Sequence, residues 1–360
     1  MLINIHKKYL IKKFCKKIFL ISLIFLILVL IINLIEETNF LKDQNVNFIT
    51  PVILTLLNAP SLLNEMFPFI FLISTQFYFI EIMENKEINT LKQFGFSNIN
   101  MVKFLFSISI FVALLIVIIF YSLSSILKNE YLKIKNKYAE DNKYLAVITK
   151  NGIWIKDTYN EKIVIINSDK IIDKNLINVS ITEFNKEFNM KKNIIAKKAY
   201  INSSEWILYE VVTTDSDNLT TNHKELVYES NFDYEKINSL FSDLTALTFF
   251  ELLRLKKDYI NAGYSVNEIN IQLHKIYSTP FLLALMTMIA TIVMIKNKFQ
   301  KNILINLFIG IFFSVIIYYL SEFSNLLGVN GKLPISLSVW FPVFVLFILT
   351  TIGLLKLNEE

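Results

Sequence analysis

Cysteine, histidine and glycine are all scarce in this chain, and each scarcity excludes a class of protein. The single Cys15 cannot form an internal disulfide, so any part of the chain outside the cytoplasm must be held together by core packing. The three histidines are isolated from cysteines and paired carboxylates at ligand spacing, which argues against a structural metal site. Only Gly95 and Gly152 precede Gly263, and neither opens a phosphate-binding loop, so the chain has no P-loop ATPase site of its own. The sequence also lacks the hydrolase nucleophile elbow and the zinc-protease helix motif, so it predicts neither catalysis nor a cofactor in this chain.

Apolar residues are abundant instead, and they make up 54% of the 360 residues. This is too apolar for an ordinary soluble protein. The net charge is a modest +5, and lysines nearly balance acidic residues in the middle third, which argues against a nucleic-acid-binding surface. Six lysines crowd the first 17 residues, ahead of the uncharged run 18–35. That run is longer than a signal-peptide core and no Ala-x-Ala site follows it, so we interpret it as a retained transmembrane helix.

Six apolar segments are long enough to span a bilayer, in two groups of three. Lysines before the first segment and acids after it place the N-terminus in the cytoplasm by the positive-inside rule, and the lysines of loop 296–301 agree. Both termini are therefore expected inside. Residues 38–59 are expected to form an outer connection with a short interfacial turn of helix at 51–57. The six predicted spans are 18–35, 62–83, 101–127, 276–295, 303–326 and 337–355.

The segment 128–244 between the two groups of spans has a different character. After a charged, helix-compatible stretch, short β-branched runs recur at a spacing typical of a β sandwich or barrel. Three spans that start inside end outside, so this β domain is expected outside the cytoplasm. The fold class is thus a polytopic α-helical membrane protein with an inserted all-β domain, divided at 1–127, 128–244 and 245–360, the last part opening with an amphipathic helix. The predicted strands are 145–149, 153–156, 162–167, 176–184, 193–201, 205–213 and 225–230.

Five side chains stand out against their surroundings. Glu65, Glu81 and Glu322 lie inside or at the edge of apolar segments, where a charge at mid-bilayer costs about 2.5–3.5 kcal/mol. One interpretation is that each carboxylate reaches the headgroup region, and this fits Glu81 best because it lies next to the polar insert. For Glu65 and Glu322 the other interpretation is that they line a hydrated cavity. Trp154 and Trp206 in the β region either pack in its core or line an apolar groove.

The polar insert 84–97 between the second and third spans contains more structure than a connection requires. A helix-compatible run begins at Glu87, Gly95 is expected to end it, and Ser97 is placed to cap the next helix. One interpretation is a solvated cytoplasmic turn. The other is a docking point for a partner.

Several stretches resemble the LptF/LptG permease family. Residues 86–97, KEINTLKQFGFS, resemble its SEL-x-x-M-x-x-x-G-[ILVF]-[ST] stretch, and residues 151–157, NGIWIKD, resemble its G-x-W-x-[RK]-D strand. The similarity covers essentially the whole chain in order, and the tryptophan-bearing strand is closer to the LptG branch than to the LptF branch. Further matches are Pro60, Pro68, Tyr259, Gly263, Lys275, Pro280, Gly310 and Pro342.

The resemblance implies a six-span subunit of the bacterial inner membrane with a periplasmic β-jellyroll. It implies an LptF-like permease subunit, an LptB-like ATPase dimer that binds ATP and Mg, and LptC-like and LptA-like β-jellyroll bridge proteins as partners. The implied cargo is lipopolysaccharide, which the complex would extract from among the lipids of the inner membrane and pass to the β-jellyroll bridge proteins. A membrane-anchored scaffold and a lipoprotein-release-type permease are the alternatives, although the latter type places its outside domain after span one.

The resemblance also assigns residues. Glu87, Leu91 and Lys92 would lie on a coupling helix that enters the ATPase groove, and Gly95 would end it. LptG proteins often carry basic residues at the outer end of span one, whereas this chain offers Asn33 there and Lys42 as the first base. The expected substrate cavity therefore comprises Asn33, Lys42, Glu65 and Glu322, and the expected β-domain groove comprises Trp154 and Trp206.

Overall fold

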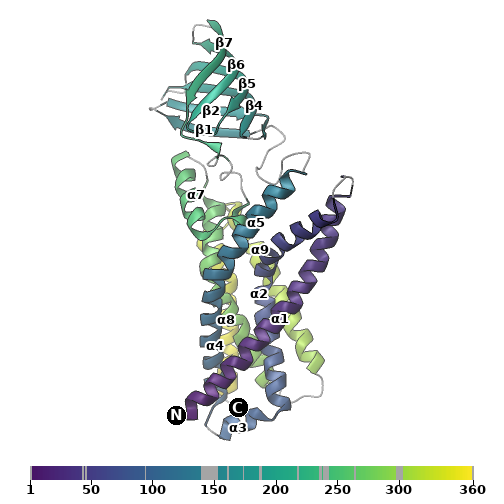
Figure 1. The fold of residues 1–360 in the computed structure, drawn as a ribbon. Helices are drawn as coiled ribbons and strands as arrows, with labels where there is room; N and C mark the ends of the chain where they lie inside the picture. The colour runs from purple at the N-terminus through teal and green to yellow at the C-terminus, as the bar shows by residue number, and fades with distance from the viewer. Residues whose placement is uncertain are drawn as a thin grey trace. The chain divides into compact units, whose positions relative to one another are not determined.

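The chain divides into two compact units, one formed by Met1–Lys128 with Asn267–Glu360 and the other by Asn129–Val266 (Figure 1). This division places the amphipathic helix before the fourth span with the β strands, whereas the sequence analysis groups it with the C-terminal spans. The computed structural model describes residues 2–42, 44, 47–93, 95–138, 153–159, 162–172, 174–185, 189–216, 219–234, 237, 243–262, 265–296 and 303–358.

The first unit is a helical bundle. Its described residues include six helices long and apolar enough to cross a membrane, as predicted. α2 and α8 form its centre, since 56% and 61% of their most apolar stretches are buried, against 22% for both α1 and α9. The elements are α1 (Leu2–Phe40), α2 (Ile49–Glu84), α3 (Glu87–Gln93), α4 (Asn98–Leu115), the π-helical turn η1 (Ile116–Phe120), α5 (Tyr121–Asn136), α8 (Asn267–Lys296), α9 (Ile303–Val329) and α10 (Ile335–Asn358), with α5 running on into the second unit.

Two spans differ from the prediction. The expected outer connection at 38–59 is wrong in its second half, because α2 starts at Ile49 and continues through Pro60 and Pro68. Proline does not end a helix in a membrane as readily as in water, since neighbouring groups satisfy the freed backbone carbonyls. The third span runs from α4 through η1 into α5, and apolar periodicity cannot predict the extra residue that a π-helical turn inserts.

The described strands of the second unit form one antiparallel sheet in the order β1-β2-β4-β5-β6-β7, with β3 pairing to β4. Six of the predicted strands are present, β3 was not predicted, and the expected strand at 145–149 lies outside the described residues. Buried and outward residues alternate along β4 and β6, as the sequence pattern indicates. The elements are β1 (Ile153–Tyr159), β2 (Lys162–Ser168), β3 (Lys170–Ile172), β4 (Asn175–Phe184), β5 (Met190–Tyr200), β6 (Glu205–Asp215), β7 (Thr220–Glu229), η2 (Leu244–Ala246) and α7 (Phe249–Ala262).

This sheet is rolled up, and side-chain contacts between its two edges show it. Asp157 on β1 accepts hydrogen bonds from the Ser230 hydroxyl at 2.9 Å and from the Asn231 backbone and side-chain nitrogens at 3.0 and 2.9 Å, just beyond β7. In a flat sheet with this strand order, β1 and β7 would be separated by five strand spacings of about 4.8 Å, or about 24 Å. The rolling explains how a single sheet buries Trp206 completely on one face.

A bend across four adjacent strands makes this rolling possible. One residue pair is missing from the pairing of each two neighbouring strands from β4 to β7, and the missing pairs lie side by side. They are Asn178 with Lys197, Lys197 with Glu210, and Glu210 with Lys224. Asn178 and Glu210 both adopt φ of 51°, a left-handed conformation that turns the strand direction. Lys197 and Glu210 form an ion pair across the bend.

Candidate functional site

The insert 84–97 folds as the sequence predicts. Asn85 and Lys86 turn the chain from α2 into the seven-residue helix α3. Gly95 follows with φ of 81°, a conformation that favours glycine, and the Phe96 backbone nitrogen bonds to the Leu91 carbonyl at 3.0 Å, which is a usual way for a helix to end. The Ser97 hydroxyl then accepts a hydrogen bond from the Asn100 backbone nitrogen at 3.2 Å and caps α4. The insert is therefore a braced helix and not a plain turn.

α3 has a buried face and an exposed face. Ile88 and Leu91 are 7% and 8% exposed and belong to the apolar cluster that contains Leu10 and Phe14 of α1. Lys92 is exposed on the other face, together with Thr90 and Gln93. The apolar face fixes the helix against the bundle, and the polar face is exposed.

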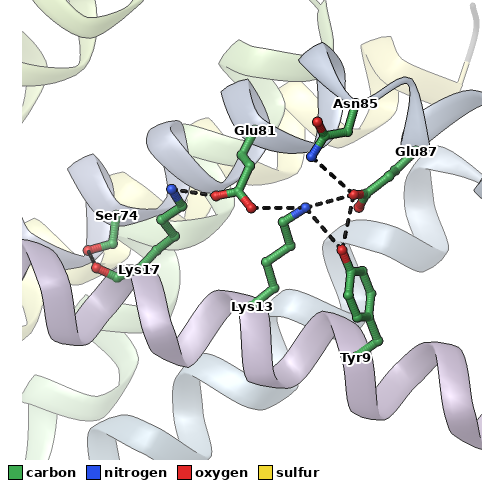
Figure 2. Close-up of polar contacts among 7 residues, drawn as sticks. All are labelled: Tyr9, Lys13, Lys17, Ser74, Glu81, Asn85 and Glu87. Carbon is green, nitrogen blue, oxygen red and sulfur yellow. Dashed lines mark hydrogen bonds and ion pairs between the residues drawn. The ribbon is translucent and has the colours of Figure 1, made fainter.

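A cluster of charged and polar side chains joins α1, α2 and α3 at this end of the bundle, as Figure 2 shows. Lys13 of α1 lies at its centre, with its ammonium 3.1 Å from a Glu81 oxygen and 2.8 Å from a Glu87 oxygen. Lys17, one turn along α1, pairs with the other Glu81 oxygen. Tyr9 and Asn85 donate hydrogen bonds to the same Glu87 oxygen at 3.1 and 3.3 Å.

The charges of this cluster balance, since two lysines face two carboxylates. The Lys13 side chain is only 7% exposed, whereas those of Glu81 and Glu87 are 36% and 24% exposed. In the described part of the chain, Lys13 is the one cation within ion-pair distance of Glu87. Removing one member of a largely buried ion pair costs more than the pair contributes, because it leaves the other charge uncompensated. The cluster thus holds α3 against α1 as long as Lys13 is present.

Sequence reasoning singled out Glu81 and Glu87 but missed their partners on α1. The available signal was the spacing of Tyr9, Lys13 and Lys17, which recur every four residues and therefore share one face of a helix. The six lysines of this region were interpreted only as topology determinants.

Two of the residues expected in a substrate cavity, Glu65 of α2 and Glu322 of α9, both lie within electrostatic range of Tyr318. Asn33 of α1 is 1% exposed and faces α2, where its side-chain oxygen accepts a hydrogen bond from the Asn58 amide at 3.3 Å. Lys42 and Glu65 are exposed. Glu322 of α9 pairs with Lys275 of α8 at 3.2 Å.

The two tryptophans of the expected groove lie on opposite faces of the sheet. Trp206 is buried inside the rolled sheet, and its indole nitrogen donates a hydrogen bond to the Phe232 carbonyl at 2.6 Å. Trp154 is 53% exposed, between the buried Ile153 and Ile155. Trp206 is therefore a core residue, and the two rings do not line one groove.

Acidic side chains also lie inside the rolled sheet. Asp157 is 2% and Glu183 is 9% exposed. Burial, followed by the negative charges of Glu183 and Asp157, raises the pKa of the Tyr228 hydroxyl, because all three disfavour the phenolate. Tyr228 therefore stays protonated and donates a hydrogen bond to Glu183.

Among the described residues, no group of three or more histidine, cysteine or acidic side chains is placed to hold a metal ion. A comparison with curated proteins finds no match. A protein-family model, described as the lipopolysaccharide export system permease LptF/LptG, matches residues 8–356. The match includes all six membrane-spanning helices, the β strands and α3. The chain therefore belongs to the LptF/LptG family, and it is a multi-pass inner-membrane permease component of lipopolysaccharide export and not a catalytic enzyme.

Proposed function

We propose that this permease is the LptG-type subunit of an ATP-driven transporter and that a partner ATPase docks on α3. The observation that carries the proposal is the build of α3, a short helix fixed on one face by Ile88 and Leu91 and open on the other at Lys92. The sequence has no P-loop, so the work must come from another chain. A braced helix at the bend between two spans is suited to pass a partner's movement into the membrane.

The four coupling residues take different roles in this proposal. Lys92 contacts the ATPase, an LptB-like dimer that binds ATP and Mg. Leu91 anchors the helix in the bundle, Gly95 ends it, and Glu87 ties its first turn to α1. Both termini and α3 lie in the cytoplasm, and the β unit lies in the periplasm.

The cargo sets the physical demands on the membrane part. Lipopolysaccharide carries several acyl chains, and exposing them to water costs about 0.8 kcal/mol per CH₂, so an apolar path must receive them. The low burial of α1 and α9 within this chain, 22% each, supports their facing a cavity shared with an LptF-like subunit. Lys42 is the candidate for contact with the anionic headgroup, and Glu65 and Glu322 are the candidates for the wall of a hydrated cavity. The burial of Asn33 favours a role in pairing α1 with α2. The β unit passes the lipid to LptC-like and LptA-like bridge proteins.

The test is co-purification of a P-loop ATPase with the tagged chain from its native membranes. We expect Lys92→Glu to abolish this co-purification and to leave membrane insertion unchanged. Lys356→Glu is the matched control, because Lys356 is also exposed and lies beside Leu357, a member of the same apolar cluster as Leu91. Nucleotide-independent transfer of lipopolysaccharide by the isolated chain would refute the proposal, as would equal ATPase recovery with both variants.

A further inference from the structure

α3 is connected to its two neighbours in sequence through the backbone. A turn at 85–86 joins it to α2, and the stretch 94–97 joins it to α4. A displacement of α3 therefore reaches these two helices through covalent bonds. α1 has no such connection, because the whole of α2 separates it from α3 in the sequence.

Two features tie α3 to α1. Ile88 and Leu91 belong to the same apolar cluster as Leu10 and Phe14, and burial in a shared cluster is non-directional. The direct contact is polar, because the Glu87 carboxylate accepts hydrogen bonds from the Lys13 ammonium at 2.8 Å and from the Tyr9 hydroxyl at 3.1 Å. A charge-assisted hydrogen bond constrains both distance and direction.

We propose that Lys13 is a positioning residue that transmits the movement of α3 to α1, so that the first span moves with the helix on which the ATPase docks. This inference rests on the proposed function, since it concerns the route by which force from that ATPase reaches the lipid path. The low exposure of Lys13, 7% of its side chain, keeps the pair from exchanging with solvent partners. Glu81 on α2 holds the other side of the Lys13 ammonium, so the lysine also aligns α1 with the end of α2.

Lys17 provides a comparison within the same cluster. It is the same residue type, one turn further along α1, and it pairs with Glu81 of α2. Replacing Lys17 thus removes an α1–α2 ion pair and leaves the α1–α3 bond in place. Lys16, which is exposed and is not a member of the cluster, serves as the control.

The experiment uses the full chain in its native complex, reconstituted in liposomes that contain lipopolysaccharide. Two rates are measured for each variant, ATP hydrolysis and lipopolysaccharide release, and their ratio gives the lipid moved per ATP. We expect Lys13→Met to keep assembly and ATP hydrolysis but to lower this ratio about fivefold or more, the lower end of ordinary coupling effects. Lys17→Met lowers it less, and Lys16→Met does not change it.

A charge exchange separates transmission from simple stabilisation. The double variant Lys13→Glu with Glu87→Lys rebuilds an ion pair between α1 and α3 but places the new carboxylate beside Glu81. We therefore expect it to recover a part of the lost ratio, whereas each single reversal does not. The proposal is overturned if Lys13→Met leaves the ratio unchanged, if assembly, hydrolysis and release fall together, or if Lys17→Met acts as strongly. A wild-type complex with no ATPase or no lipid release would instead refute the proposed function, which is a distinct result.

Discussion

Asp157 is the residue whose replacement tests the rolled sheet most directly. Its buried carboxylate accepts three hydrogen bonds, from the Ser230 hydroxyl and from two nitrogens of Asn231. Hydrogen bonds to charged groups contribute about 1.5–3 kcal/mol each, but these three share one carboxylate and are not additive. Asp157→Ala also removes this partner from the hydroxyl of Ser230, a residue that is only 2% exposed. Part of the loss is offset, because the variant no longer has to bury a charged carboxylate. We expect the free energy of opening β1 to fall by about 3 kcal/mol.

Hydrogen exchange of the full-length protein in detergent measures this opening. At 1.4 kcal/mol per factor of ten, the backbone amides of β1 should exchange about 150-fold faster in the variant. Asp169→Ala is the matched control, because Asp169 is exposed and accepts one side-chain bond from Asn178 at 2.7 Å, so its loss should cost under about 1 kcal/mol. Acceleration of β1 below about tenfold, or an equal effect of the control, would show that the polar contacts of Asp157 do not close the sheet.

Three further predictions follow from other contacts. A Cβ at Gly310 would lie 2.7 Å from Gln76 Cδ in a fully buried α2–α9 contact, so Gly310→Ala should destabilise the bundle by about 1–3 kcal/mol, seen as a lower thermal midpoint in detergent. Trp206→Phe removes a buried hydrogen bond and should weaken the β unit by about 1–3 kcal/mol in protease-protection assays, whereas Trp154→Phe on the exposed side should have little effect. The pKa of Tyr228 is raised in the folded chain, so as the pH rises the unfolded chain loses this proton first. The contribution of Tyr228 to the free energy of unfolding is therefore fully present below about pH 10 and decreases above it. Tyr228→Phe should reduce this decrease, measured by hydrogen exchange corrected for the intrinsic exchange rate.

Local signals were sufficient for the number and order of the spans and for the insert. Long uncharged runs predict transmembrane helices because hydrocarbon accepts few other structures, and all six appear among the described residues. Gly95 and Ser97 were predictable for a similar reason, since the end of one helix and the cap of the next depend on backbone conformation and neighbouring residues. The start of α2 was mispredicted because Pro60 ends helices in water, whereas a membrane removes the competing solvent.

The sequence by itself determined most of the elements, their order and the absence of a P-loop, because each follows from short-range chemistry along the chain. Only the tertiary structure decided which charges meet. Lys13 and Glu87 are 74 residues apart, and Asp157 and Asn231 are also 74 apart, so nothing local links either pair. The same holds for the two tryptophans, whose placement on opposite faces depends on how the sheet rolls. A charge has a low-energy place in an apolar surrounding only beside its partner, and the packing of whole helices and strands decides which partner that is.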